Sequence, residues 1–247
     1  MEEVEFCDPF DRKKYDYWMK LEHAGRYVFA KDFINNNFVD AVVADISCAT
    51  GYGTAFLADC CKMIDGYDFN EEYLRLAERR KIQNAKFFQV DFNNEILDNK
   101  CYDVVASFET IEHIDSTENF LKSLSNIVKN GGVLLLSVPN SKFEELDENG
   151  NIKYKFHKHV FKEEEMKTLL EKHNFEIVKV LGQSLCNRIV AKEEALKECH
   201  PNIYSKNLLN RYNYSPKSII MNSYIYAFPD EVLLDESYSH IYICRRK

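Results

Sequence analysis

The stretch VVADISCATGYGT, residues 42–54, joins an apolar run of strand length to a loop of small residues and then to the start of a helix. A buried strand that leads through such a loop into a helix is typical of a parallel α/β sheet that binds a cofactor at the end of its first strand. Ser47 and Ala49 stand where glycine would be expected in such a loop. The stretch therefore raises the question of what this loop binds.

Apolar runs and helical patterns alternate along the chain. The runs AVVADI, KMIDGYD, KFFQVD, YDVVASFE and GGVLLLSV are separated by helical patterns such as EEYLRLAERRK and ENFLKSLSNIVKN. Residues 161–183 add another helix and strand, and SHIYICRR near the end adds a last strand. This alternation predicts an α/β fold with a doubly wound, mostly parallel sheet of seven strands and helices on both faces.

Two flanking segments complete the predicted organisation, which is a single domain over residues 1–247. Residues 12–37 have the pattern of one or two amphipathic helices that cover the site, and residues 183–218 read as a polar, partly helical insertion. Lys129 stands just before a Gly-Gly pair, which is typical of the last turn of a helix. We therefore expect the fifth strand to begin near Val133.

Composition excludes several classes of protein. The formal net charge is -8, and the basic residues lie mostly beside acidic ones, so the chain lacks the basic surface that nucleic-acid binding needs. The sequence has no run near the roughly 18 apolar residues of a membrane span and no apolar signal core at its start. We expect a cytoplasmic protein with no membrane span, and the oligomeric state stays open.

Cysteine and histidine spacing gives no signature of a metal site. The eight cysteines include no CxxC pair, which predicts reduced thiols. His157 and His159 are the only close histidine pair, and they have no cysteine or carboxylate at a recognised ligand spacing. The sequence therefore predicts no metal.

Four acids fall at or near the ends of the first four predicted strands: Asp45, Asp68, Asp91 and Glu109. In a parallel sheet these ends share one edge, where ligands bind. Asp68 follows the loop by about 20 residues, the spacing at which a carboxylate accepts hydrogen bonds from a ribose diol. The loop reads D-x-S-x-A-x-G-x-G rather than G-x-G-x-x-G, and the acid that precedes it suits a cationic amino group better than a pyrophosphate. The cofactor indicated is S-adenosylmethionine rather than a dinucleotide.

Six motifs in order carry a resemblance to class I S-adenosylmethionine-dependent methyltransferases of the broad group that includes ubiquinone-biosynthesis and sugar-modifying enzymes. They are VADISCATGYGT, GYDFNEEYLRLA, FFQVDF, YDVVASFETIEHID, FLKSLSNIVKNGGVLLLSVPN and FHKHVFKEEEMKTLLEKHNFEIVKVLGQ, and LEHAGRYVFA is similar to the leading helix of that family. The resemblance covers nearly the whole chain. It implies that the cofactor is bound by Arg26, Tyr27, Asp45, Ser47, Gly51, Asp68, Phe69, Asp91, Phe92 and Phe108, with Asp91 and Phe92 beside the adenine and Arg26 and Tyr27 at the methionine end.

Ala49 is the main departure from the family pattern, because its methyl group either crowds the cofactor or disfavours a positive φ. We expect the turn to keep a negative φ at Ala49 and to tolerate alanine. The alternative is a weakened or vestigial site.

Two histidines are the candidate catalytic residues. A sulfonium methyl group is already electrophilic, so a hydroxyl acceptor gains from a general base whereas an amine needs only to be neutral. His113 follows the fourth strand as base or as a brace bonded to Glu109 or Glu112, and His157 lines the acceptor pocket, with His159 as a surface neighbour. Tyrosines of RYNYSP and NSYIYAF are candidate pocket walls or plain core.

The predicted function is O-methylation of a small polar metabolite such as a sugar, a nucleotide-linked sugar or a cell-surface glycan precursor. N-methylation of a small amine, a non-catalytic subunit that binds S-adenosylmethionine, and a dinucleotide oxidoreductase are the alternatives.

Overall fold

The computed structural model describes residues 8–10, 17–98, 102–184, 195, 198–201, 215–231 and 234–247. In these residues seven strands form one sheet: β1 (Val42–Ile46), β2 (Met63–Asp68), β3 (Ala85–Gln89), β4 (Tyr102–Phe108), β5 (Val128–Pro139), β6 (Phe175–Gln183) and β7 (Ser239–Arg246). Their order is β3-β2-β1-β4-β5-β7-β6, and only β7 runs antiparallel to its neighbours. The predicted doubly wound, mostly parallel sheet is confirmed.

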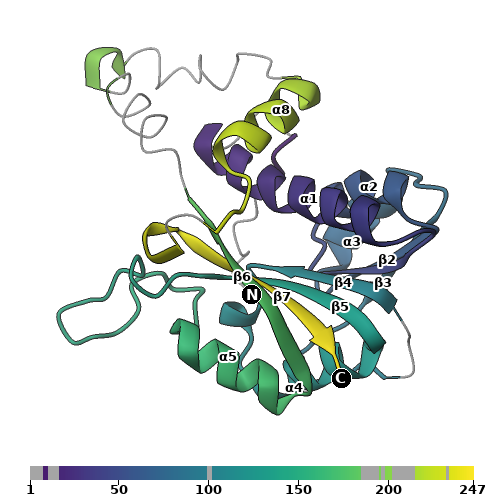
Figure 1. The fold of residues 1–247 in the computed structure, drawn as a ribbon. Helices are drawn as coiled ribbons and strands as arrows, with labels where there is room; N and C mark the ends of the chain where they lie inside the picture. Colours follow the sequence, from purple (N-terminus) through teal and green to yellow (C-terminus); the bar gives the residue numbers. More distant parts are fainter. Residues whose placement is uncertain are drawn as a thin grey trace.

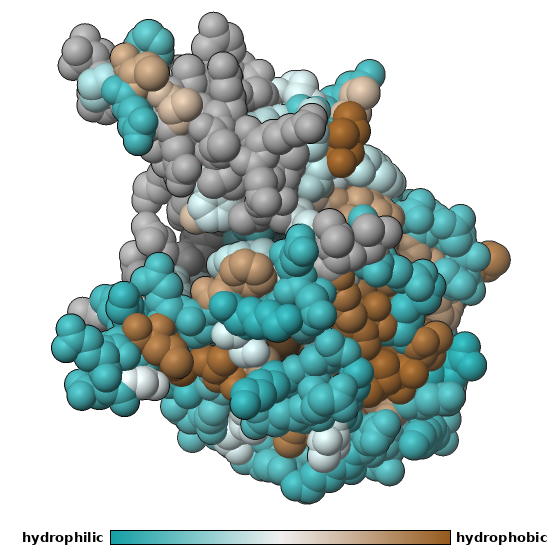
Figure 2. Space-filling view, turned by 60° about the vertical axis from the view of Figure 1, so that its left-hand side comes forward, coloured by the Kyte–Doolittle hydropathy of each residue, from teal (hydrophilic) through white to brown (hydrophobic). Residues whose placement is uncertain are grey.

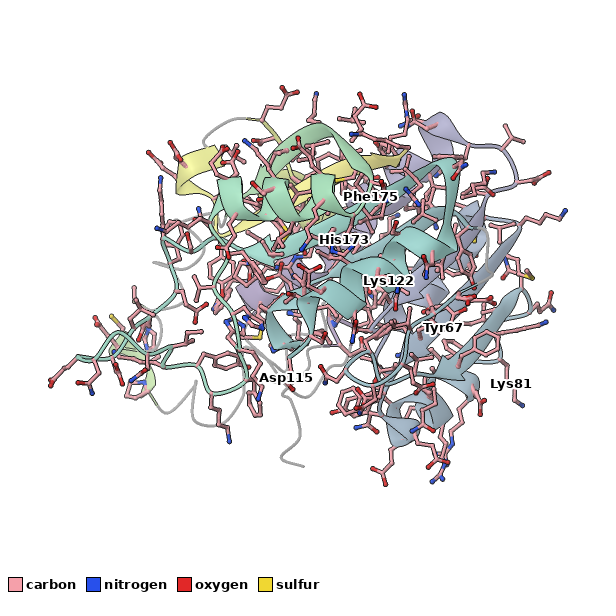
Figure 3. All side chains as sticks on the ribbon, turned by 90° about the horizontal axis from the view of Figure 1, so that it is seen from below. Tyr67, Lys81, Asp115, Lys122, His173 and Phe175 are labelled. Carbon is pink, nitrogen blue, oxygen red and sulfur yellow. The ribbon has the colours of Figure 1, made fainter. Side chains whose placement is uncertain are left out.

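Helices cover both faces of the sheet (Figure 1). One face carries α1 (Tyr17–Asn37), α2 (Tyr52–Leu57), α3 (Glu71–Glu78) and α8 (Pro216–Tyr226), and the other carries α4 (Thr117–Ile127) and α5 (Glu163–Lys172). Figure 3 looks onto the second face, with Lys122 on α4 and His173 directly after α5. Short 3-10 turns follow α2 (Ala58–Cys60), β4 (Ile111–His113) and α8 (Leu234–Glu236).

The central strands contribute side chains to two hydrophobic cores, one on each face of the sheet. Successive side chains of a strand point to opposite faces. In β5, Leu134 and Leu136 pack into the core beneath α4 and α5, whereas Leu135 packs into the core beneath α1. Because both faces are covered, the central strands read as continuous apolar runs rather than as alternating ones.

Residues 17–37 form one continuous helix, α1, which lies between the sheet and α8. Ala30 and Ile34 pack into the core against the sheet, and Leu21 and Ala24 pack against Ile219 of α8. A helix with apolar contacts on two sides is buried rather than amphipathic. Residues 11–16 and most of the predicted insertion 183–218 lie outside the described residues.

The expectation that a helix reaches Lys129 and that the fifth strand begins near Val133 was wrong. Helix α4 ends at Ile127, and β5 begins at Val128, which pairs with Tyr102 before the register shifts to Val104 opposite Val133. The Val128 side chain is buried in the core under α4, so pairing and packing extend the strand through the residues expected to end the helix. Gly131 takes a φ of 77° within this irregular stretch.

The strand order reverses beside β1, which has β2 on one side and β4 on the other. Ligand sites of open α/β sheets lie at such a reversal, beyond the carboxyl ends of the strands. None of the helices among the described residues is long and apolar enough to cross a membrane. The face in Figure 2 is mainly hydrophilic, with its apolar side chains in separate groups.

Candidate functional site

The loop after β1 alternates left-handed backbone positions. Ser47, Ala49 and Gly51 have φ angles of 58°, 47° and 70°. The expectation that Ala49 keeps a negative φ was therefore wrong. Its backbone N–H donates a 2.8 Å hydrogen bond to Oδ2 of Asp68, and this bond holds the loop against the end of β2. Left-handed backbone costs an L-residue roughly 1–2 kcal/mol, so the loop is strained at Ala49.

Two loop glycines are required by packing. A Cβ atom on Gly51 would lie 2.7 Å from Cβ of Ala77 on α3, and one on Gly53 would lie 2.0 Å from Cζ of Tyr27 on α1. Distances this short cannot be accommodated without movement of the neighbouring helix or ring. The glycines of the sequence motif thus let α2 approach α3 and α1 closely.

Asp68 joins the loop to the turn after β2. Its Oδ1 accepts a hydrogen bond from the backbone N–H of Asn70 at 2.9 Å, and its Oδ2 accepts the bond from Ala49. The residue is buried, which raises the pKa of its carboxyl, while the backbone hydrogen bonds lower it. Each carboxylate oxygen has a second lone pair, so these bonds leave acceptor capacity for a ribose diol.

Asp45 is buried under the same loop. It accepts hydrogen bonds from Oγ1 of Thr54 at 2.6 Å and from the hydroxyl of Tyr27 at 3.0 Å. Burial raises the pKa of its carboxyl to about 6, although these two hydrogen bonds lower it. The Tyr27 ring in turn packs edge-on against Tyr52 and Phe108, so α1, α2 and β4 meet at this acid.

Arg26 is the buried cation of the site. Its Nη2 lies 3.3 Å from Oε2 of Glu109, and it donates a 3.2 Å hydrogen bond to Oγ of Ser239. Its Nε is buried without a hydrogen-bond partner among the described residues. Burial raises the pKa of nearby Glu22 to about 8, although the charge of Arg26 lowers it.

Phe69, Asp91 and Phe92 follow the ends of β2 and β3. Phe69 follows β2 with 43% of its surface exposed, so its ring is available to a ligand. Asp91 accepts hydrogen bonds from the Asn93 backbone and the Asn94 side chain, which fixes the turn after β3. The Phe92 ring is buried edge-on against Phe120 of α4, and its place beside the adenine stays a prediction.

His113 and His157 lie close together, with ring centroids 5.0 Å apart. Nδ1 of His113 is 2.9 Å from the carbonyl oxygen of Phe156, and Nδ1 of His157 is 2.8 Å from Oε2 of Glu144. Both partners accept hydrogen bonds, so the ring protons belong on Nδ1, and Nε2 of each neutral ring carries the lone pair. His113 is therefore hydrogen-bonded to the Phe156 carbonyl through Nδ1, its Nε2 faces Oε1 of Glu112 at 3.8 Å, and burial lowers its pKa.

The partner of His113 is the carbonyl oxygen of Phe156, the first residue of the sixth motif, and it is reached through residues 141–155, which the sequence patterns did not single out. We call residues 141–159 the arm. It leaves the sheet after β5, is closed by a bridge between Leu146 and Ile152, and returns where the backbone N–H of Lys158 donates a 2.7 Å hydrogen bond to the carbonyl oxygen of Glu112. The turn signal DENG in the arm is visible in the sequence, but its contact with the end of β4 is not.

Glu112 is the other site residue whose role the sequence did not predict. It is buried, and neither carboxylate oxygen has a hydrogen-bond partner among the described residues. Its Oε1 is 3.8 Å from Nε2 of His113. Burial raises the pKa of this carboxyl well above its ordinary value, and the charge of Glu109 raises it further.

The remaining sequence candidates are placed elsewhere. His159 is half-buried, and its Nε2 has no hydrogen-bond partner among the described residues. Tyr224 and Tyr226 are exposed on α8, and the former stacks on Phe228. The tyrosines of RYNYSP lie outside the described residues.

The reversed strand order, the left-handed loop and the acids at the strand ends define a class I S-adenosylmethionine-dependent methyltransferase. Residues 20–180 match the model of the methyltransferase domain family, and the chain belongs to this family. S-Adenosylmethionine is the cofactor that this membership implies, and Asp45, Asp68 and Phe69 offer it a carboxylate pair and an exposed ring. The class predicted from the sequence is confirmed.

Relatives with curated descriptions include other methyltransferases. A probable S-adenosylmethionine-dependent methyltransferase of Mycolicibacterium smegmatis is 29% identical over 57% of this chain and 54% of its own length. The ubiquinone biosynthesis O-methyltransferase of Colwellia psychrerythraea is 26% identical over 42% of this chain and 44% of its own length. The chain thus matches about half the length of these relatives.

Solved structures share the fold at low identity. The [4+2]-cyclase SpnF has a TM-score of 0.62 at 15% identity. The match covers 96% of this chain and 85% of the SpnF chain. A possible histamine N-methyltransferase of Thermotoga maritima has a TM-score of 0.60 at 17% identity, with 93% of each chain covered. Similarity at this level establishes the fold and leaves the reaction to the site.

Proposed function

We propose that the chain transfers the methyl group of S-adenosylmethionine to a hydroxyl oxygen of a small polar acceptor, such as a sugar, a nucleotide-linked sugar or a cell-surface glycan precursor. The observation that carries this proposal is the histidine pair at the end of β4. Nδ1 of His113 and of His157 is held by a fixed acceptor, which leaves the Nε2 lone pairs for an incoming hydroxyl.

The cofactor supplies an electrophilic methyl group, and the chain positions the acceptor and removes its proton. We assign the ribose diol to Asp68, the amino group of the methionine moiety to Asp45, and the adenine face to Phe69. Arg26, which is paired with Glu109, and Tyr27 would hold the methionine end. We assign Ser47, Gly51 and Phe108 to the wall of this site, and Asp91 and Phe92 to the border of the adenine.

Hydroxyl methylation accounts for the histidines better than amine methylation does. A hydroxyl is a weak nucleophile near neutral pH, whereas a neutral amine needs no base. Burial lowers the pKa of His113, so this ring stays neutral at pH 7 and can accept a proton. The similarity to a ubiquinone biosynthesis O-methyltransferase supports the same acceptor atom.

Methyl transfer from labelled S-adenosylmethionine to matched pairs of hydroxyl and amine compounds tests this proposal. We expect O-methyl product from at least one sugar-type acceptor and none from the amine of the same ring. An N-methyl product alone would support the amine alternative. Product from no acceptor, with S-adenosylhomocysteine bound, would favour the non-catalytic subunit.

His113→Asn tests the role of the histidine. The variant should keep its affinity for S-adenosylhomocysteine within about threefold and lose turnover by roughly 10² to 10⁴. His157→Asn serves as the companion variant, because its ring lies across the same gap. Near-normal turnover in both variants would rule out a catalytic role for the pair.

A further inference from the structure

Three side chains at the end of β4 and on the arm converge on one point. Glu112, His113 and His157 each offer a ligand atom, and these atoms all lie within 4.8 Å of one another. The first two are neighbours in the short turn Ile111–His113, and the third comes from the returning end of the arm. No other group of this kind was found among the described residues.

In both rings Nδ1 donates a hydrogen bond, so Nε2 is the nitrogen that is available to bind a metal. Nδ1 of His113 donates to the carbonyl oxygen of Phe156, and Nδ1 of His157 donates to Oε2 of Glu144. Metal-binding histidines almost always donate their second ring N–H to a carbonyl or carboxylate, which orients the ring and makes the other nitrogen more basic. Both rings have this arrangement, one with a backbone carbonyl as the acceptor and the other with a carboxylate.

Glu112 is a buried acid whose carboxylate accepts no hydrogen bond from the described residues. Only 1% of the residue is exposed. The nearby cation, Arg26, directs its Nη2 to Glu109 instead. A buried polar group without a partner is costly, and a bound cation would supply the missing one.

We propose that Glu112, His113 and His157 bind one divalent ion of the first transition series. Two imidazoles with one carboxylate suit Zn²⁺, Co²⁺, Mn²⁺ or Fe²⁺, whereas Mg²⁺ and Ca²⁺ prefer sites made of oxygen ligands. Three protein ligands leave coordination positions open, as in catalytic rather than structural metal sites.

The role of the ion rests on the proposed O-methylation. An acceptor hydroxyl bound at an open position becomes more acidic, so with the ion bound its proton passes to water, and the two imidazoles, which remove the proton in the metal-free site, serve as ligands instead. A lone pair of the acceptor oxygen then forms the bond to the methyl carbon. The bond from methyl carbon to sulfur breaks, and its electron pair stays on the sulfur as a neutral thioether.

Titration of the chelator-treated full chain with Co²⁺ tests the site without any acceptor, because cobalt bound to imidazole absorbs visible light. We expect one equivalent to bind, Zn²⁺ to displace it, and Mg²⁺ to leave the spectrum unchanged. Glu112→Gln, His113→Asn and His157→Asn should each weaken Co²⁺ binding by roughly 100-fold or more, and Glu144→Ala by roughly 10- to 100-fold.

His159→Asn is the matched control, because this histidine lies two residues from His157 on the same arm and outside the cluster. It should bind Co²⁺ as the wild type does. Circular dichroism confirms that each variant is folded, and His157→Asn, on the arm, keeps the test informative if Glu112→Gln does not fold. No uptake by the wild type, or equal loss in His159→Asn, would overturn the proposal.

The metal measurement is independent of methyl transfer. Metal bound without O-methyl product would leave the site standing and count against the proposed function. O-Methyl product that is unaffected by chelation, with no Co²⁺ bound, would overturn the metal site and leave the proposed function standing.

Discussion

Ala49→Gly should stabilise the protein, although glycine usually weakens a fold. The φ of 47° at Ala49 costs an L-residue roughly 1–2 kcal/mol, which glycine would not incur. Against this gain stands the greater freedom of glycine in the unfolded chain, about 0.4–1 kcal/mol. The net expectation is a free energy of unfolding that rises by about 0.5–1 kcal/mol.

Ala55→Gly is the matched control, since Ala55 lies in α2, six residues along the same chain segment. It too loses a methyl group and gains a glycine, but at a helical position, where the change costs about 1 kcal/mol. Urea unfolding of both variants should therefore show shifts of opposite sign. A loss of stability in Ala49→Gly equal to that in Ala55→Gly would refute the assignment of strain to Ala49.

The same variant decides whether alanine weakens the cofactor site. If Ala49 is strained but does not obstruct the ligand, Ala49→Gly should change the affinity for S-adenosylhomocysteine by less than about tenfold, or about 1.4 kcal/mol. A gain of a hundredfold would show that the methyl group crowds the cofactor. That outcome would favour the vestigial reading of the loop.

Three further predictions follow from the loop and its acids. Burial raises the pKa of Asp45 in the folded state to about 6, from its ordinary 3.8. Between these two pH values the folded state binds a proton that the unfolded state has released. The free energy of unfolding should therefore fall by about 3 kcal/mol as the pH rises from about 4 to 6. Asp45→Asn should flatten that part of the profile, and an unchanged slope would exclude Asp45 as its source. Gly51→Ala should lower the free energy of unfolding by at least about 2 kcal/mol, because the new Cβ atom would meet Ala77. Gly131 has a similar φ but no atom within 4 Å of a new Cβ, so Gly131→Ala should lower it by only about 1 kcal/mol. Equal losses in the two variants would exclude a contribution from packing at Gly51. Tyr27→Phe removes one hydrogen bond to Asp45 and should lower stability at pH 7 by about 1.5–3 kcal/mol in thermal unfolding, and no loss would mean that water replaces the hydroxyl.

The order of strands and helices could be predicted from the sequence because it depends on local periodicity. The runs that became β1, β2 and β4 are short, mostly apolar and carry an acid at or near the carboxyl end, and these features are visible in short windows. The end of α4 could not be predicted in the same way. It depends on Val128 pairing with Tyr102, a contact between residues distant in the chain.

The backbone of the loop was also beyond local prediction. Alanine favours a negative φ, but the hydrogen bond from the Ala49 N–H to Asp68, at the end of β2, holds the loop in the opposite conformation. A tertiary contact thus overrides the local preference. Ser47, two residues earlier, follows the same pattern.

The cluster of Glu112, His113 and His157 shows the same limit for the site. The only close histidine pair in the sequence, His157 and His159, has no further ligand at a recognised spacing and so predicted no metal. The fold instead brings His157 to residues more than 40 positions earlier, through the arm. Side chains brought together across such a distance leave no spacing signature in a single sequence.

Calorimetric titration with S-adenosylhomocysteine tests most directly whether the loop and Asp68 form an S-adenosylmethionine site. The wild type should bind one equivalent, and NADH should give no binding heat. Asp68→Asn should bind at least tenfold more weakly, since a charged hydrogen bond is worth about 1.5–3 kcal/mol, whereas Asp59→Asn, at an exposed acid on the turn after α2, should bind normally. Folded wild-type protein that releases no heat with S-adenosylhomocysteine, or an Asp68→Asn variant with unchanged affinity, would contradict the account.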